Sequence, residues 1–222
     1  MKIKILKSVL EQNDNQAQIN RKKFKQTGTL GVNVMGSPGC GKTTLIEEIV
    51  KSMKDKYRIG VIEGDYAGTV DAEKLSSYGI PVVQLDVSSC HLNADFVGSA
   101  LNHMSLDELD IVLIENVGNL ICPAEFDIGD LLKLVLYSVP EGDDKPIKYP
   151  LMFSQADAVV LTKIDLLPHF EFNKKKVKES ISRLNKKFEL FEFSKKDPTS
   201  VKLVANYLES NFRKLVRSYG DL

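Results

Sequence analysis

The segment from Gly36 to Thr44 reads GSPGCGKTT and fits the phosphate-binding pattern G-x-x-x-x-G-K-[ST]. In this pattern glycines let backbone N–H groups close around phosphates, the lysine neutralises their charge, and the hydroxyl binds Mg²⁺. A strand is expected over residues 30–35 and a helix over 45–50, which is the order that the pattern requires. A glycine-rich turn that binds nothing is the minor alternative. The expected nucleotide contacts here are Gly36, Gly39, Cys40, Gly41, Lys42, Thr43 and Thr44.

Two acidic residues follow or end predicted strands. Asp65 comes after a strand expected over 58–63, and Glu115 ends an apolar strand expected over 110–115. Open α/β sheets bind ligands at the carboxyl ends of their strands, so both carboxylates are candidates for Mg²⁺ and its water. A helix cap or turn is the alternative for Asp65. Lys42, Asp65 and Glu115 are therefore the predicted catalytic residues, and Gly118 offers a backbone N–H for the terminal phosphate.

A third strand end carries Lys163 and Asp165, directly after a strand expected over 158–161. The lysine stem can cover a base, and the carboxylate can accept from the N1–H and amino groups of guanine. Adenine has no such pair of donors, so the pattern predicts GTP. Ser194 and Lys195 follow another predicted strand and could brace the base. An ordinary surface loop is the alternative for these residues.

Cys90, His91 and Cys122 are expected in loops at this same edge of the sheet. Thiolate and imidazole are ligands that suit Zn²⁺ and Ni²⁺. A site with three ligands from one chain either keeps an open coordination position or is shared with a second copy of the chain across a two-fold axis. Buried, inert cysteines are the alternative. His103 and His169 have no nearby thiol and are expected to be surface or capping histidines.

Strands and helices alternate along the 222 residues, enough for one sizeable α/β core. We expect a three-layer P-loop NTPase fold: a mostly parallel sheet of roughly seven strands with helices on both faces. Residues 3–25 predict an amphipathic helix that docks outside the sheet, with the apolar positions Ile3, Leu6, Leu10, Ile19 and Phe24. Residues 140–146 are expected to form a loop. The expected organisation is an N-terminal helical extension over 1–29 and a P-loop GTPase domain with the metal site over 30–222.

Charge and apolar runs exclude several classes of protein. Thirty basic and thirty acidic residues cancel, which disfavours nucleic acid and anionic membranes as partners. The start of the chain has no apolar signal region, and no later run is long enough to span a membrane. We therefore expect a cytoplasmic protein, whose three separated cysteines do not form a disulfide framework.

Together these motifs resemble the HypB family, nickel-inserting SIMIBI-class P-loop GTPases of hydrogenase maturation. Besides the phosphate loop, the resemblance rests on VIEGD at 61–65, CHLNA at 90–94, ENVGNLICP at 115–123 and KIDLLP at 163–168, and it covers roughly residues 30–195. It implies a GTP-dependent homodimer that binds nickel, and also zinc, at its interface. It further implies delivery of nickel to a hydrogenase large-subunit precursor, together with a partner nickel metallochaperone.

The resemblance also implies roles for single residues. Cys90, His91 and Cys122 would be Ni²⁺ or Zn²⁺ ligands, and Thr43, Asp65 and Glu115 would serve Mg²⁺. Lys148 matches a loop through which one protomer approaches the nucleotide of the other.

Three departures from the family pattern carry expectations. Thr162 stands where asparagine is usual, so we expect the loss of an amide that braces the phosphate loop and a lower affinity for GTP. No cysteine motif or histidine-rich tract precedes the domain, which argues against nickel storage. The loop after Ser194 lacks the usual glycines. Because no arginine or glutamine stands out as a transition-state residue, slow intrinsic GTP hydrolysis is expected.

Three other functions compete with this interpretation. A urease-type nickel-insertion GTPase usually carries Cys-Pro-His. A small-molecule kinase would have an arginine-rich lid and prefer ATP, and a passive metal-binding protein would need more ligands and bind metal independently of nucleotide. The sequence favours coupling between the nucleotide site and the metal site, because Cys122 lies only seven residues after Glu115.

Overall fold

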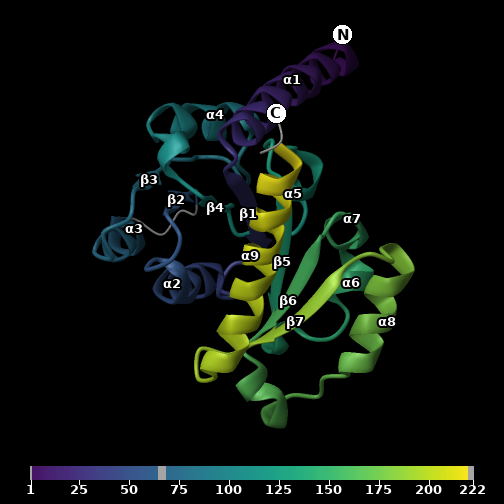
Figure 1. Ribbon diagram of the computed structural model, residues 1–222. Helices are drawn as coiled ribbons and strands as arrows, with labels where there is room; N and C mark the ends of the chain where they lie inside the picture. The colour runs from purple at the N-terminus through teal and green to yellow at the C-terminus, as the bar shows by residue number, and fades with distance from the viewer. Residues whose placement is uncertain (1, 65–68, 220–222) are drawn as a thin grey trace.

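The computed structural model describes residues 2–64 and 69–219 and contains a central sheet of seven parallel strands (Figure 1). Its strands are β1 (Leu30–Gly36), β2 (Ile59–Glu63), β3 (Val82–Gln84), β4 (Ile111–Glu115), β5 (Leu132–Ser138), β6 (Ala158–Thr162) and β7 (Glu189–Phe193). They lie in the order β3-β2-β4-β1-β5-β6-β7, and every neighbouring pair is parallel. Every residue of β1, β2 and β4 is buried, as expected of central strands covered on both faces.

Helices cover both faces of this sheet. They are α1 (Lys2–Thr27), α2 (Lys42–Met53), α3 (Thr69–Ser76), α4 (Ala94–Asn102), α5 (Cys122–Glu125), α6 (Lys145–Lys148), α7 (Pro150–Ser154), α8 (Lys174–Leu184) and α9 (Pro198–Tyr219), with 3-10 turns η1 (Leu106–Glu108), η2 (Val139–Glu141) and η3 (Ile164–His169). Side chains of α2, α3 and α9 share one core with the sheet, whereas α1, α4, α7 and α8 bury theirs against the other face. The predicted three-layer α/β fold is therefore confirmed.

The phosphate loop lies where the order of strands reverses. After β1 the chain builds β2, β3 and β4 on one side of it and then β5, β6 and β7 on the other. In open α/β sheets this switch point, at the carboxyl ends of the strands, is where ligands bind. Parallel pairing also sets Glu115, the last residue of β4, opposite Val34 of β1. The topology thus brings the loop and a strand-end carboxylate together.

Helix α1 forms as predicted, but its buried face differs in part from the expected one. Over residues 10–27 the buried side chains are Asn13, Ala17, Asn20 and Phe24, spaced by four, three and four residues. Of the expected apolar pattern, Phe24 is fully buried, but Leu10 and Ile19 are 37% and 50% exposed. The buried stripe of α1 is half polar, so hydrogen bonds as well as apolar contacts must fix this helix on the domain.

Residues 140–146, which we predicted as a loop, are partly helical. Ser138 and Glu141 form a reciprocal capping box that starts η2, and a proline follows the first residue of α6. Both are local signals for helix starts that the apolar pattern does not reveal. Across residues 2–64 and 69–219, no helix combines the length and apolar character that a membrane span requires.

Candidate nucleotide and metal site

Two glycines give the phosphate loop its shape. Gly39 and Gly41 have φ angles of +68° and +98°, a backbone conformation that glycine adopts without strain. Gly41 is also the N-cap of α2 and supplies no side chain to cap it, so the first turn of the helix faces the loop with its N–H groups. Helix N-termini of this kind bind anions through backbone N–H groups and the helix dipole. At the start of the loop, a Cβ on Gly36 would lie 2.7 Å from the Cys40 sulfur and would also clash with the backbone of β5, so no larger residue fits there.

Cys40 lies fully buried beneath the loop. Burial raises the pKa of its thiol to about 12, despite the opposing charge of Lys42. The side chain therefore stays a neutral thiol and packs as a small apolar group. The side chain is therefore closed to a nucleotide, and the predicted contact of Cys40 can come only from its backbone.

Lys42, Thr43 and Glu115 meet at the start of α2. The Thr43 hydroxyl donates to Glu115 Oε1 (2.8 Å), and Lys42 Nζ lies 4.0 Å from the same oxygen, with both charged side chains buried. Adjacent ligands of octahedral Mg²⁺, at about 2.1 Å from the ion, lie about 3 Å apart. The separation of the two oxygens thus fits a magnesium site. Thr44 lies in the first turn of α2, and Asp65 falls outside the described residues.

Thr162 braces the phosphate loop from the end of β6. Its hydroxyl donates to Cys40 O (2.5 Å) and also approaches Tyr137 O (3.4 Å). Lys163, whose φ angle is +57°, donates from Nζ to Gly39 O (2.7 Å). We expected the missing asparagine to remove a brace from the loop, and the structure contradicts this because the shorter hydroxyl reaches a carbonyl of the loop directly.

Replacing Thr162 by valine should weaken GTP binding. The valine keeps the shape but leaves the buried Cys40 carbonyl without this donor, which costs about 1 kcal/mol or roughly fivefold in Kd. Titration of a fluorescent GTP analogue measures the change. Thr162→Ser retains the hydroxyl and should bind nearly as the wild type does, whereas equal affinity of Thr162→Val and wild type would show that the brace has no effect.

Asp165 is held in place by two groups from the loop after β7. Ser194 Oγ donates to Asp165 Oδ1 (2.8 Å), and Lys196 Nζ lies 2.9 Å from Oδ2. The hydrogen bond from Lys196, with that from Ser194, holds the pKa of Asp165 below its usual range, so the side chain is a carboxylate at neutral pH. Ser194 is buried as a brace should be, whereas the predicted Lys195 is exposed and its neighbour Lys196 makes the contact.

The three candidate metal ligands converge. Cys90 Sγ lies 2.8 Å from Cys122 Sγ and 3.6 Å from His91 Nδ1, and all three ligand atoms lie within 4.8 Å of one another. Sulfur and nitrogen atoms bound to one Zn²⁺ at about 2.0–2.3 Å are spaced by about 3–4 Å. The separation of Cys90 Sγ and His91 Nδ1 falls within this range, whereas the two sulfur atoms lie closer together and would move apart to share one metal ion. Cys90 is exposed, and the other two ligands are half-buried.

Neighbouring groups tune these ligands. The His91 ring stacks on Phe126 with centroids 3.8 Å apart, and burial lowers the pKa of the imidazole, which favours the neutral form that binds metal. The pKa of Cys122 is raised, mainly by its hydrogen bond with the Cys90 thiol and to a smaller extent by burial. Metal binding must therefore displace the proton of Cys122, which makes binding stronger at higher pH.

Two asparagines bond to the segments that carry the metal ligands, and one of them, Asn119, also bonds to the phosphate loop. The backbone N–H of Asn119 donates to Gly36 O (3.0 Å), and its side chain donates to Cys90 O (3.3 Å) and accepts from Ile121 N (2.8 Å). Asn116, fully buried, accepts from Leu92 N (3.0 Å). Both asparagines lie in the segment that resembles HypB, but spacing alone gave no reason to assign them a role.

The remaining predicted residues have different surroundings. A Cβ on Gly118 would lie 3.0 Å from Pro38 Cα, so this residue packs tightly on the phosphate loop. Lys148 is exposed at the end of α6 and pairs with Asp144 (2.6 Å), which leaves a role across a dimer as a prediction. His103 caps the end of α4 and His169 ends η3, both away from the thiol pair.

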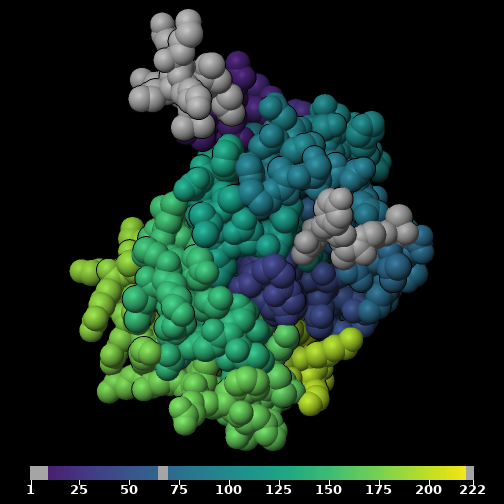
Figure 2. Space-filling view, turned by 180° about the vertical axis from the view of Figure 1, so that it is seen from behind, coloured from purple at the N-terminus to yellow at the C-terminus, as the bar shows by residue number. Residues whose placement is uncertain are grey.

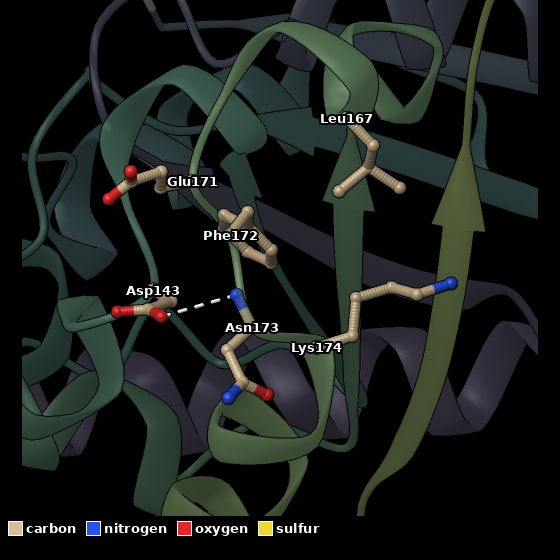
Figure 3. Close-up of a pocket in the computed structure, with 6 residues that line it drawn as sticks. All are labelled: Asp143, Leu167, Glu171, Phe172, Asn173 and Lys174. Carbon is tan, nitrogen blue, oxygen red and sulfur yellow. Dashed lines mark hydrogen bonds between the residues drawn. The ribbon is translucent and has the colours of Figure 1, made fainter.

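A shallow hollow of about 570 Å³ opens beside η3 (Figure 3). It is lined by Asp143, Leu167, Glu171, Phe172, Asn173 and Lys174. Asp143 accepts from Asn173 N (3.2 Å) and pairs with Lys176 (2.6 Å), so its carboxylate already has partners. None of the predicted site residues lines this hollow, and we assign it no ligand.

The fold and the phosphate loop define a P-loop NTPase. The family model described as "CobW/HypB/UreG, nucleotide-binding domain" matches residues 31–192. The chain is 42% identical to the hydrogenase/urease maturation factor HypB of Helicobacter hepaticus, covering 93% of this chain and 87% of that protein. It is 39% identical to the probable hydrogenase maturation factor HypB of Methanocaldococcus jannaschii, with 95% and 96% covered.

A solved structure agrees with these similarities. HypB from Helicobacter pylori in complex with nickel superimposes with a TM-score of 0.87 at 37% identity, covering 94% of this chain and 97% of that one. The chain therefore belongs to the HypB group of maturation factors within the CobW/HypB/UreG family.

Proposed function

We propose that the protein is a GTP-hydrolysing nickel metallochaperone that inserts nickel into a hydrogenase large-subunit precursor. GTP controls both its dimerisation and its binding and release of the metal. The nickel-bound HypB structure and the maturation-factor names of the relatives support nickel as the cargo and hydrogenase maturation as the process.

The observation that carries this proposal is the position of Asn119. A single residue bonds to the first residue of the phosphate loop, to the carbonyl of Cys90 and to the N–H before Cys122. A shift of the loop around a terminal phosphate must therefore change hydrogen bonds on both sides of the metal cluster. A passive metal-binding protein would have no need of this connection.

In the nucleotide site, Lys42 and the backbone of the loop bind phosphates, and Gly118 lies near the terminal one. Mg²⁺, when bound at Thr43, Glu115 and Asp65, would neutralise charge that develops on the phosphates. Asp165 reads guanine and Lys163 covers the base. The absence of an evident transition-state arginine supports slow intrinsic hydrolysis.

A homodimer completes the metal site. Three ligands per chain leave coordination open, and Cys90 is exposed. Ile121, next to Cys122, is 56% exposed, and Ile147 and Leu151 on α6 and α7 are 59% and 47% exposed, which gives apolar surface that a second copy could cover. Lys148 would then approach the nucleotide of the partner.

Delivery to urease is the second candidate function. Relatives from Helicobacter hepaticus and Helicobacter pylori are named hydrogenase/urease maturation factors. In either case a second nickel metallochaperone would act with this protein, and the nucleotide cycle would be the same: GTP favours the dimer and the metal-binding geometry, and hydrolysis loosens both.

The test is nickel affinity in two nucleotide states. The wild-type protein is titrated with Ni²⁺ in the presence of GDP and of a non-hydrolysable GTP analogue, and its oligomeric state is followed by sedimentation. We expect affinities that differ by about tenfold, in the usual range of coupling energies, and a dimer that depends on nucleotide. Identical affinity and oligomeric state with both nucleotides would refute the proposal.

A further inference from the structure

Helix α1 touches both segments that carry the candidate metal ligands. Cys90 and His91 lie just before α4, and Cys122 begins α5, whose chain continues through residues 126–131 into β5. Figure 1 shows α1 running along α4, and Figure 2 shows the purple surface of α1 against the teal surface of that region. Phe24 of α1 shares an apolar cluster with side chains of α4 and with Ile128. The polar half of the buried stripe of α1 adds hydrogen bonds to both segments.

Asn13 has one contact on each segment. Its Oδ1 accepts from Ala94 N (2.9 Å), at the start of α4, and its Nδ2 donates to Asp127 O (2.9 Å). Both carboxylate oxygens of Asp127 in turn accept hydrogen bonds from Arg21 of α1 (2.7 Å each). Ala94 lies three residues after His91 and Asp127 five residues after Cys122, so this one amide spans the two ligand-bearing segments.

Asn20 repeats the arrangement two helical turns later. Its Nδ2 donates to Ala94 O (2.7 Å) and to Ile128 O (3.0 Å), and its Oδ1 accepts from Gln16 Nε2 (2.9 Å). Asn20 is fully buried, and its amide donates both of its hydrogens. Both backbone polar groups of Ala94 are thus bonded to side chains of α1.

Two glycines allow this close approach. A Cβ on Gly98 of α4 would lie 2.6 Å from Gln16 Nε2 and 2.9 Å from Asn20 Oδ1. A Cβ on Gly129 would lie 2.6 Å from Asn20 Cβ and would contact Ala17 O. Each glycine belongs to one of the two ligand-bearing segments, so both segments are shaped to receive the same stretch of α1.

We infer that α1 is a positioning element of the metal site, in which Asn13 and Asn20 fix the spacing between the Cys90-His91 segment and the Cys122 segment. The inference rests on the proposed metal site and adds that a helix outside the phosphate-loop domain determines its affinity. Groups that orient metal ligands from outside the first coordination sphere typically change affinity by 10–100-fold when removed.

The test compares four variants of the full chain by Ni²⁺ titration and by the intensity of the thiolate-to-nickel charge-transfer absorption. Asn13→Ala and Asn20→Ala should each weaken Ni²⁺ binding about tenfold or more and lower this absorption. Gln16→Ala keeps the helix and removes only the hydrogen bond that Gln16 donates to Asn20 Oδ1. It should weaken Ni²⁺ binding less than the two asparagine variants do. This milder variant keeps the test decisive if Asn20→Ala does not fold.

Thr29→Val is the matched control. Thr29 is fully buried just beyond α1 and donates to Leu106 O (2.8 Å) and Leu109 O (3.0 Å), away from both ligand segments. It should lower thermal stability about as much as Asn13→Ala but leave Ni²⁺ affinity within twofold. Wild-type nickel affinity in folded Asn13→Ala and Gln16→Ala, or an equal loss in Thr29→Val, would overturn the inference.

Nickel binding by Cys90→Ala distinguishes failure of the proposed metal site from failure of the role of α1. If Cys90→Ala bound Ni²⁺ as the wild type does, the cluster would not be the nickel site, and this inference would fall with the proposed function. If Cys90→Ala abolished binding while the asparagine variants bound normally, only the role of α1 would be refuted.

Discussion

Asp165→Asn should bind GTP about 100-fold more weakly than the wild type. The carboxylate can accept two hydrogen bonds from guanine, each worth about 1.5–3 kcal/mol because the acceptor is charged. An asparagine amide offers one acceptor and places donors against the guanine amino group. Xanthosine triphosphate has a carbonyl at that position, so Asp165→Asn should bind it more tightly than it binds GTP. Competition titration with the two nucleotides measures both effects.

Asp107→Asn is a suitable control for this exchange. Asp107 is an exposed carboxylate in η1, before β4 and therefore at the opposite edge of the sheet. Its replacement should leave the affinities for both nucleotides unchanged. If Asp165→Asn kept GTP affinity within threefold of the wild type, Asp165 would not read the base.

Cys90→Ala and Cys122→Ala should each weaken Ni²⁺ binding by about 100-fold and leave GTP affinity in the absence of metal unchanged. Binding energies of about 10–16 kcal/mol for four-ligand sites correspond to about 3 kcal/mol for each ligand. The two sulfur atoms lie 2.8 Å apart, so removal of either one takes a ligand from the same site. Competition against a chelator of known affinity gives the nickel affinity.

His103→Ala tests whether this loss is specific. His103 lies at the end of α4 and outside the cluster, and its removal should not change nickel affinity. Equal nickel affinity in the wild type and Cys122→Ala would exclude the cluster as the nickel site.

The fold could be predicted, and so could the meeting of the candidate site residues that the structure describes at one edge of the sheet, because their signals are local. Buried strands are continuous apolar runs, and the loop from Gly36 to Thr44 determines its conformation through glycines at fixed positions. Strand ends then meet at one edge because the sheet is parallel. The apolar runs, together with this rule for strand ends, were therefore sufficient to place Glu115 near the phosphate loop.

What the sequence could not reveal depends on partners far along the chain. Thr162 braces a carbonyl 122 residues away, and Asn20 bonds to a residue 74 positions away. An apolar count treats an asparagine as an exposed residue, so it missed Asn13 and Asn20 in the buried stripe of α1. Lys196 was missed for a related reason: the turn after β7, and not the residue type, decides which of two adjacent lysines reaches Asp165.

The central claim is that nucleotide state and metal affinity are coupled through the residues between Glu115 and Cys122. The decisive measurement is the ratio of nickel affinities with GDP and with a non-hydrolysable GTP analogue, in the wild type and in Asn119→Ala. We expect a ratio of about ten in the wild type and close to one in the variant, since its side chain no longer joins Cys90 to the loop that contacts Gly36. A variant that still binds both ligands and keeps the wild-type ratio would contradict the account.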